Sequence, residues 1–183
     1  MTASVTEISR LFHAWGNDKY SESVSQLAHA EQCAALATKA GADDDLVVAA
    51  LLHDIGHLLV LDAHGGVPSL DTDDEHEATG ARFIAQLLGP RVAGPIALHV
   101  PAKRYLCAVE SGYFETLSPA SVASLRMQGG AMSNDEATRF ERLPHFTAAV
   151  NLRRWDEEAK VPDLDVASFA TYLPTLERLA ART

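Results

Sequence analysis

The segment AALLHDIGHLL, residues 49 to 59, constrains the fold of this chain more than any other stretch. Its Ala, Leu and Ile residues predict a buried helix, yet it also carries His53, Asp54 and His57. Burying imidazole and carboxylate groups among apolar side chains costs free energy unless they are paired or bind a ligand. The segment therefore predicts a core helix that is also part of a binding site.

Helical spacing of apolar residues continues along nearly the whole chain. Val5, Ile8, Leu11, Phe12 and Trp15 follow the i, i+3, i+7 pattern of an amphipathic helix. Further helices are expected at about 23–40, 44–61, 75–88 and 91–107, from residue 119, and at about 134–142, 145–159 and 165–181. Residues 62–74 are rich in Gly, Pro and Asp and predict a loop. With no convincing run of alternating β-branched residues, the sequence predicts an all-α helical bundle, a single domain over residues 1–183.

Composition and charge narrow the function classes. The chain has 183 residues and a formal net charge of −10, which argues against a general nucleic-acid binder. We find no basic segment followed by an apolar block at the N-terminus, and no apolar run approaching the roughly 18 residues of a membrane span. Two cysteines without metal-type spacing fit a reducing compartment. We therefore expect a cytoplasmic protein with a small-molecule substrate and no evident protein, membrane or nucleic-acid partner.

The His-Asp pair has the character of a metal site. His53 and His57 are four residues apart and so lie on one helix face, and Asp54 is rotated by about 100° from His53. A carboxylate in such a pair can bridge two metal ions. One helix cannot close this site, so we expect further ligands from other helices, namely His29, His76, His99 and Asp156. Nitrogen and oxygen ligands without thiolate favour iron, manganese or another borderline ion over structural zinc.

Each of these residues also has a simpler explanation when it is taken alone. A lone buried His is usually a satisfied core residue, and Asp156 would ordinarily pair with Arg153 or Arg154 on the surface. Lys103 follows His99 by four residues, and Arg153 precedes Asp156 by three, so each lies beside a candidate ligand. Cations next to metal ligands suit a phosphonate or phosphate group, although a solvated helix face is the alternative.

The ordered set of His and Asp residues resembles the HD-domain superfamily, whose mark is the His53-Asp54 doublet. The stretches LVVAALLHDIGHL, HVPAKRYL, LRMQGGAMS and RRWDEEAK resemble its branch of mixed-valent di-iron oxygenases that degrade phosphonates. This resemblance implies an HD-domain helical bundle holding two Fe ions, as Fe(II) and Fe(III), with O2 as co-substrate. Asp54 would bridge the irons, with His29, His53 and Asp156 on one and His76 and His99 on the other.

The same resemblance implies the substrate contacts. His57 and Lys103 correspond to the phosphonate-binding pair and, with Asp54, to the catalytic residues. Ser121, Gln128 and Arg153 match the other positions that contact the phosphonate. From the residues themselves, Ser121 is also explained as a first-turn residue of the helix that Ser118 caps and Pro119 begins.

The sequence departs from the family before the first His. The family places a Tyr and a Glu there, with two residues between them, to recognise the substrate amine. In KYSESVSQLAH, Glu22 aligns with that Glu, but Tyr20 precedes it by only two positions. Either Tyr20 still serves, or Lys19 takes its place and the amine differs. A trimethylated amine would suit a carboxylate with an aromatic face, as Glu22 and Tyr20 provide.

The resemblance thus predicts an oxygenase that cleaves the C–P bond of a 1-hydroxy-2-(amino or trimethylammonio)ethylphosphonate, releasing phosphate and glycine or glycine betaine. Two alternatives stay open. The first is a metal-dependent phosphohydrolase of the same superfamily, acting on nucleotides or phosphate esters through metal-activated water without O2. The second is a non-catalytic metal-binding or regulatory module, which would have no need of the phosphonate contacts.

Overall fold

The computed structural model describes residues 2–19, 23–67 and 76–182, which form helices and contain no strand. The all-α prediction is confirmed. In order, the helices are α1 (Val5–Trp15), α2 (Gln26–Lys39), α3 (Asp44–Leu52), α4 (Ile55–Ala63), α5 (His76–Leu88), α6 (Pro90–Val109), α7 (Tyr113–Thr116), α8 (Pro119–Met127), α9 (Asn134–Phe140), α10 (Phe146–Glu158) and α11 (Phe169–Ala180).

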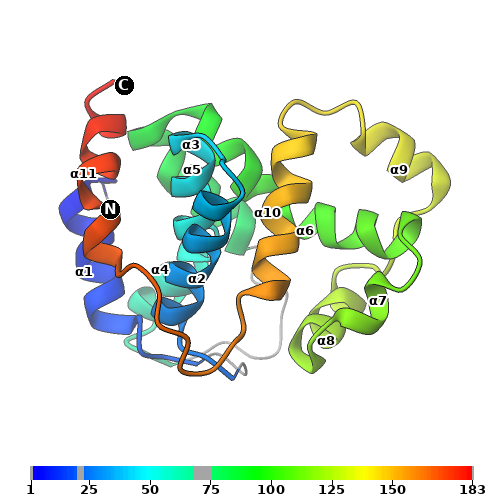
Figure 1. Cartoon of the computed structure of the whole chain (residues 1–183), viewed down its shortest axis with the longest axis horizontal. Helices are drawn as coiled ribbons and strands as arrows, with labels where there is room; N and C mark the ends of the chain where they lie inside the picture. The colour runs from blue at the N-terminus through cyan, green and yellow to red at the C-terminus, as the bar shows by residue number, and fades with distance from the viewer. Residues whose placement is uncertain (1, 20–22, 68–75, 183) are drawn as a thin grey trace.

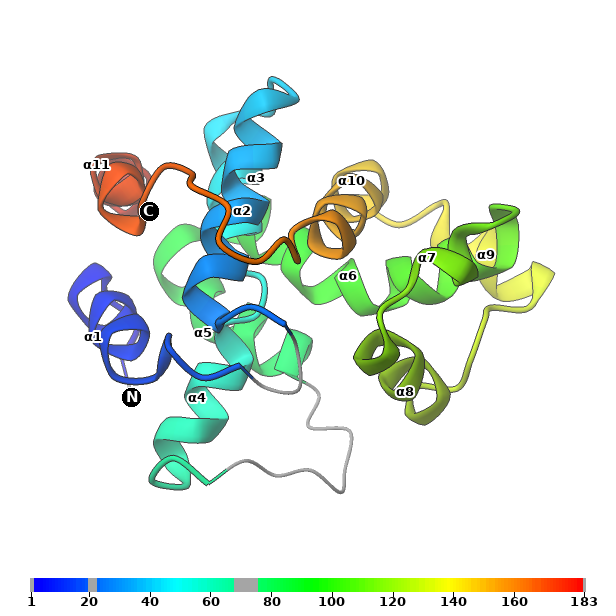
Figure 2. The ribbon, with the colours of Figure 1, turned by 60° about the horizontal axis from the view of Figure 1, so that its bottom comes forward.

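The helices form two groups joined by α6 and α10 (Figures 1 and 2). The first group contains α1 to α5 and α11, and the second contains α7 to α9. The 20-residue helix α6 starts against α5 and extends to the second group, while α10 packs along α6 and also contacts α2 and α3. The largest hydrophobic cluster lies in the first group, and two smaller clusters form around Leu106 and Phe140. The candidate ligands therefore come from helices that share the main core.

Helix starts follow the capping residues of the sequence. The side chains of Ser4, Ser25, Asp43 and Ser118 each accept a hydrogen bond from a backbone N–H in the first helical turn. The α2 helix begins at Gln26 rather than near residue 23 because Ser25 adopts an extended conformation and caps it. The cap that the sequence predicts at Ser118 is present, and Ser133 forms a capping box with Glu136 at the start of α9.

The helix expected over 44–61 is interrupted. It divides into α3 and α4 at His53-Asp54, where the Asp54 backbone leaves the helical region with φ −97° and ψ 11°. Asp54 stands at the N-cap of α4 but makes no side-chain capping bond. Its carboxylate faces imidazoles of other helices instead, and the break in the helix permits that orientation.

The short helix α7 is absent from the sequence-based expectation, which places no helix between residues 107 and 119. Gly112 precedes it with φ 86°, a left-handed conformation that suits glycine. Four residues are too few to show helical periodicity. The helix buries Tyr113, whose hydroxyl reaches α10.

One apolar stretch differs from expectation in length. Residues Asp44–Ala63 are long and apolar enough to cross a membrane by length and composition alone, although 67% of the stretch is buried within the protein, as in a core helix.

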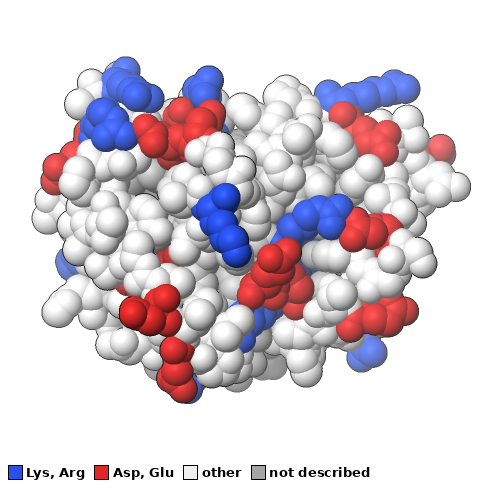
Figure 3. Space-filling model, in the orientation of Figure 1, with Lys and Arg blue, Asp and Glu red and all other residues white. Residues whose placement is uncertain are grey.

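On the face shown in Figure 3, Lys and Arg side chains lie in small separate groups, several of them beside Asp or Glu. This face carries no continuous basic surface of the kind that binds nucleic acid.

Candidate metal centre

Asp54 lies at the centre of the histidine cluster. Its Oδ2 atom is 3.5 Å from His53 Nε2 and 3.7 Å from His29 Nε2. Its Oδ1 atom is 3.6 Å from Nε2 of both His76 and His99. Each oxygen of one carboxylate therefore faces a different pair of imidazoles, which is the arrangement needed for a carboxylate that bridges two metal ions.

The first pair of imidazoles is anchored by backbone carbonyls. Nδ1 of His29 donates to Ala159 O at 2.8 Å, and Nδ1 of His53 donates to Ala50 O at 2.9 Å. Because a carbonyl oxygen only accepts, the proton of each ring sits on Nδ1, and Nε2 is the atom that presents a lone pair. The two Nε2 atoms lie 3.2 Å apart, and the Oδ1 atom of Asp156 is 3.3 Å from Nε2 of His29.

The second pair consists of His76, the first residue of α5, and His99 on α6. Nδ1 of His99 donates to Ile96 O at 2.7 Å, which again leaves Nε2 as the ligand atom. The Nε2 atoms of His76 and His99 are 3.3 Å apart. The ring of His57 stacks on that of His76 with 3.9 Å between centroids, so His57 lies beside the second pair rather than within it.

Gly56, in the segment AALLHDIGHLL, allows α4 to approach the start of α5. A Cβ atom at Gly56 would lie 2.0 Å from the carbonyl oxygen of His76. Gly80 on α5 packs against the same point, where its own Cβ would lie 3.1 Å from Gly56 N. Glycine is thus required at position 56 to bring His76 next to the His-Asp doublet.

The six predicted ligands fit a pair of metal ions. Two facing imidazole lone pairs at 3.2–3.3 Å repel each other unless a cation or a proton lies between them. The donors are nitrogen and carboxylate oxygen, the set that suits iron or manganese. Cys33, which is not among the predicted ligands, also lies close, with its Sγ 3.8 Å from His29 Nε2. Burial raises the pKa of the Cys33 thiol, which keeps it protonated and a poor ligand.

Electrostatics keeps the carboxylates ionised. Burial alone would raise the pKa of Asp54, but the positive charge of His53, His57 and His76 lowers it well below its usual range. The pKa of Asp156 is likewise low because Arg153 outweighs the effect of burial. These are the protonation states that metal coordination requires.

The pKa values of the imidazoles shift in opposite directions in the two pairs. Burial would lower the pKa of His53, but Asp54 and Asp156 raise it to about 9. Cys33 and Asp156 overcome the effect of burial and raise the pKa of His29. Burial and the neighbouring His53 and His76 hold the pKa of His99 far below its ordinary value. A metal ion competes with protons at the first pair, so its affinity there falls as pH falls.

Three cations lie close to the candidate metal ligands, and Arg153 among them contacts Asp156 directly. We call Lys103, Arg153 and Lys160 the cation cluster. Lys103 on α6 is 4% exposed, and its Nζ donates to Ser124 Oγ on α8 at 2.7 Å. Burial, followed by repulsion from Arg153, lowers the pKa of Lys103 to about 8. A buried cation beside hydroxyl donors suits an anionic ligand.

Arg153 connects the cation cluster to the metal ligands. Its Nη1 donates to Asp156 Oδ2, while Asp156 Oδ1 faces His29 and His53. Its Nε donates to Tyr113 Oη at 3.0 Å, and its Nη2 reaches Ser121 Oγ at 3.3 Å. The guanidinium is therefore held at all three nitrogen atoms.

Glu157 and Lys160 belong to this site and were not singled out from the sequence. Glu157 accepts hydrogen bonds from Arg153, Ser121 and Lys160, and Lys160 Nζ also donates to Ser121 Oγ at 3.0 Å. Their spacing gives a signal, since Glu157 follows Arg153 by four residues on α10. The sequence also gave no role to Ser124 or Tyr113, which come from segments without a recognisable motif.

The remaining predicted substrate contacts are Gln128, Tyr20 and Glu22. Gln128 Oε1 is buried and has no hydrogen-bond partner among the residues that the structure describes. A buried amide of this kind is available to a ligand. Tyr20 and Glu22 lie outside the described residues, and Lys19 is exposed.

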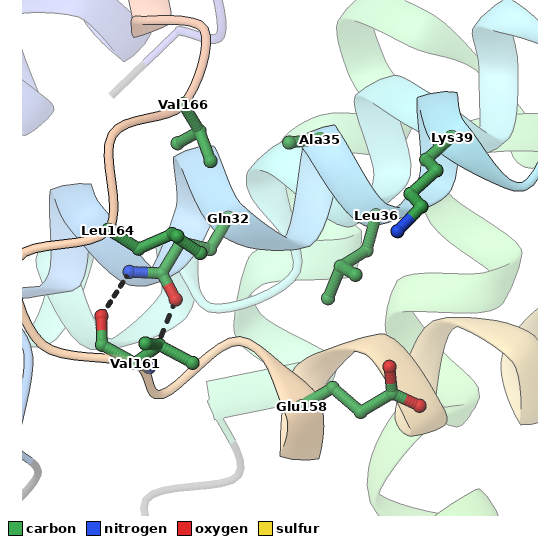
Figure 4. A pocket seen from close by; sticks show the side chains of 8 residues that line it. All are labelled: Gln32, Ala35, Leu36, Lys39, Glu158, Val161, Leu164 and Val166. Atoms are coloured by element: carbon green, nitrogen blue, oxygen red, sulfur yellow. Dashed lines mark hydrogen bonds between the residues drawn. The ribbon is translucent and has the colours of Figure 1, made fainter.

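A separate cavity of about 280 Å³ lies between α2 and the chain that follows α10 (Figure 4). Gln32 crosses it and exchanges two hydrogen bonds with the backbone of Val161, at 2.8 and 3.1 Å. Apolar residues such as Leu36 and Leu164 line the rest, with Lys39 and Glu158 at its edge. None of the predicted ligands lines this cavity.

Comparison with known proteins agrees with the geometry. Residues 26–109 match the HD domain. The chain is 45% identical over 173 residues to a hydroxymethylphosphonate dioxygenase of Gimesia maris, covering 94% of this chain and 86% of that protein. It is 35% identical over 175 residues to a [1-hydroxy-2-(trimethylamino)ethyl]phosphonate dioxygenase (glycine-betaine-forming) of Leisingera caerulea, covering 94% and 88%. It is also 34% identical over 160 residues to the uncharacterized protein L432 of Acanthamoeba polyphaga mimivirus, covering 86% and 73%.

Proposed function

The chain belongs to the HD domain family as one of its phosphonate dioxygenases, and from this premise we propose that it uses O2 to cleave the C–P bond of a 1-hydroxyphosphonate at a di-iron centre. The observation that carries the proposal is the placement of Asp54, whose two oxygens face two separate pairs of imidazoles. A site for one metal ion would not require the second pair of imidazoles, His76 and His99, on the other oxygen of Asp54.

We assign the metal ligands as the sequence predicted them. His29, His53 and Asp156 would hold one iron, His76 and His99 the other, and Asp54 would bridge them. Bound there, the irons would supply the redox chemistry with O2 that protein side chains cannot perform. The ligand set supports a borderline ion such as iron, and metal analysis of the purified protein tests its identity.

The cation cluster would bind the phosphonate. Lys103 and Arg153 would neutralise its charge, and Ser121, Gln128 and Ser124 would contribute hydrogen-bonding groups. Asp156 ties Arg153 to the first metal site, so the anion would bind with its C1 hydroxyl directed toward the metals. His57, stacked on His76, would complete the site on the side of the second metal. Burial of these groups keeps bulk water away from the reacting carbon.

For the substrate, we favour hydroxymethylphosphonate. The relative that is 45% identical carries that name, whereas the relative that acts on the trimethylated compound is 35% identical. The altered spacing of Tyr20 and Glu22 also weakens the case for an amine group. With hydroxymethylphosphonate, one O2 would convert the substrate into formate and phosphate. The aminoethyl and trimethylammonioethyl compounds would give glycine and glycine betaine.

The test is a substrate comparison with the iron-loaded protein. Hydroxymethylphosphonate and the two 1-hydroxyethylphosphonates are each incubated with and without O2, and phosphate and the carbon product are measured. We expect O2-dependent release of phosphate and formate in equal amounts. Phosphate release from none of the three compounds would contradict the proposal, as would O2-independent hydrolysis of nucleotides by the manganese-loaded protein.

A further inference from the structure

Building on the proposed function, we propose that Glu157 is a positioning residue that fixes the anion-binding side chains Arg153, Ser121 and Lys160 for the phosphonate. Glu157 is not needed as a metal ligand, because the neighbouring Asp156 is the residue whose carboxylate faces His29 and His53. Glu157 instead contacts the groups that would surround the substrate anion.

Both oxygens of Glu157 are occupied. Oε1 accepts from Ser118 N at 2.7 Å, and Oε2 accepts from Ser121 Oγ at 2.9 Å, from Lys160 Nζ at 3.3 Å and from Arg153 Nη2. The side chain is only 7% exposed. Ser118 caps α8, and Ser121 lies in the first turn of that helix. One carboxylate therefore joins the start of α8 to Arg153 within α10 and to Lys160 just after it.

The charge of Glu157 lets two cations share one hydroxyl. Arg153 Nη2 and Lys160 Nζ both approach Ser121 Oγ, at 3.3 and 3.0 Å. Without a carboxylate between them, the two cations would repel each other and separate. The Ser121 hydroxyl proton would also lose the acceptor that fixes its direction. Glu157 thus maintains the spacing of the cation cluster.

Glu157 also determines how Arg153 is presented. Tyr113, Asp156, Glu157 and Ser121 accept from four of the five N–H groups of its guanidinium. The fifth, on Nη1, has no acceptor among the described residues. Because a guanidinium is planar and rigid, fixing Nη2 with Glu157 also fixes the direction of this remaining N–H. A phosphonate oxygen is the acceptor that the proposed function supplies.

Charge alone predicts the opposite role, since a buried carboxylate repels a phosphonate dianion. The two roles predict opposite changes in anion affinity when Glu157 is neutralised. If Glu157 positions the donors, its neutralisation weakens anion binding. If it competes with the substrate for them, its neutralisation strengthens binding. The contact with the backbone N–H of Ser118 favours positioning, because a displaced Glu157 would leave the start of α8 without that bond.

The experiment compares iron-loaded Glu157→Gln with the native enzyme and with Glu158→Gln. Glu158 is the next residue, is exposed, and undergoes the same change of charge. KM and kcat are measured with hydroxymethylphosphonate. Binding of methylphosphonate, which lacks the C1 hydroxyl, is measured by calorimetry. For Glu157→Gln we expect KM and the methylphosphonate Kd to rise about tenfold or more, as expected when charge-assisted hydrogen bonds are lost, while kcat changes less than about threefold. Glu158→Gln should behave as the native enzyme.

An unchanged or tighter Kd in Glu157→Gln would overturn the proposal. If that variant loses metal or does not fold, Glu157→Asp keeps the charge but shortens the reach, and it should show the same rise in KM with normal metal content; a native KM in this variant would also overturn the proposal. Methylphosphonate separates this proposal from the proposed function. If the native protein turns over none of the phosphonates but binds methylphosphonate more tightly than Glu157→Gln does, the role of Glu157 is supported and the oxygenase reaction is contradicted. Failure of the native protein to bind methylphosphonate would overturn the proposed role.

Discussion

The histidine cluster and the cation cluster lie side by side but are held together differently. The imidazoles of His29, His53 and His99 are short, buried and oriented by backbone carbonyls of the main core. The cations Lys103, Arg153 and Lys160 are long side chains that are oriented mainly by other side chains. The difference teaches that the proposed metal site depends on the packing of helices, whereas the proposed anion site depends on a network of charged side chains that single substitutions can alter.

The largest expected effect is at the shared ligand. Asp54→Asn keeps the shape but removes the charge that faces both imidazole pairs, and its amide nitrogen cannot coordinate a metal ion, so the bridge between the two proposed metal ions would be lost. We expect activity to fall by more than the roughly 100-fold seen when outer partners of metal ligands are removed. Metal content, measured by mass spectrometry, should fall with it. Asp44→Asn, at an exposed ion pair with Arg178, is the matched control. Full metal content in Asp54→Asn would contradict the bridging role.

The next effect tests the dependence on helix packing. In Gly56→Ala the new Cβ would meet the carbonyl oxygen of His76 at 2.0 Å, so α4 and α5 must separate. We expect a loss of about 3 kcal/mol in the free energy of unfolding, at the upper end for overpacking, measured by urea denaturation. Metal affinity should fall as well. Gly80→Ala meets its nearest atom at 3.1 Å and should cost clearly less. Equal effects of the two substitutions would show that the clash does not control the distance between α4 and α5.

A smaller effect tests the charge network. The pKa of Lys103 is lowered from 10.5 to about 8, so the cation is lost as pH rises through about 8 rather than above 10. Methylphosphonate affinity should therefore decline between pH 7.5 and 9.5, as followed by calorimetry. The phosphonate itself only gains negative charge over this range, so a decline reports the protein. Lys103→Arg stays charged and should lose the decline. A decline that persists in this variant would assign the effect to another group.

The smallest effect lies away from both clusters. Glu136 completes the capping box of α9 with Ser133 and pairs with Arg104. Hydrogen bonds from the Ser133 backbone and side chain, and then from Arg104, lower its pKa from 4.5 to about 2. Its contribution to stability is therefore present above about pH 4.5 and is lost as pH falls toward 2.

Glu136→Gln should lower Tm slightly at pH 7, by an amount that shrinks below pH 4.5, and should leave kcat and KM unchanged. Thermal unfolding across this pH range is the measurement. A change in KM would mean that α9 is coupled to the proposed anion site, to which it contributes none of the assigned residues.

The helices were predictable because their signals are local. Caps such as Ser118 and Ser133, and apolar residues at i, i+3 and i+7, act within one or two turns. The break at His53-Asp54 was missed because nothing local requires it. At the break the Asp54 carboxylate faces His76 and His99, and both residues are distant in sequence.

The candidate site divides in the same way. The six proposed metal ligands could be named from residue type, their order and the resemblance to the HD-domain superfamily, and the His53-Asp54 pair is conspicuous in an apolar segment. Glu157, Lys160 and Ser124 are ordinary surface residue types. Apart from the four-residue spacing of Arg153 and Glu157, what marks them is their partial burial beside Arg153 and Lys103. Tyr113 was missed because α7 is too short to be recognised by periodicity.

The sequence by itself determined that this protein is a helical bundle with histidines and aspartates buried in it, because helix periodicity and the cost of burying polar groups act at short range. Only the tertiary structure decided that α2, α5, α6 and α10 bring those residues to the two sides of one carboxylate. That convergence depends on how close the core lets the helices approach, as Gly56 and Gly80 show, and no local pattern encodes that distance.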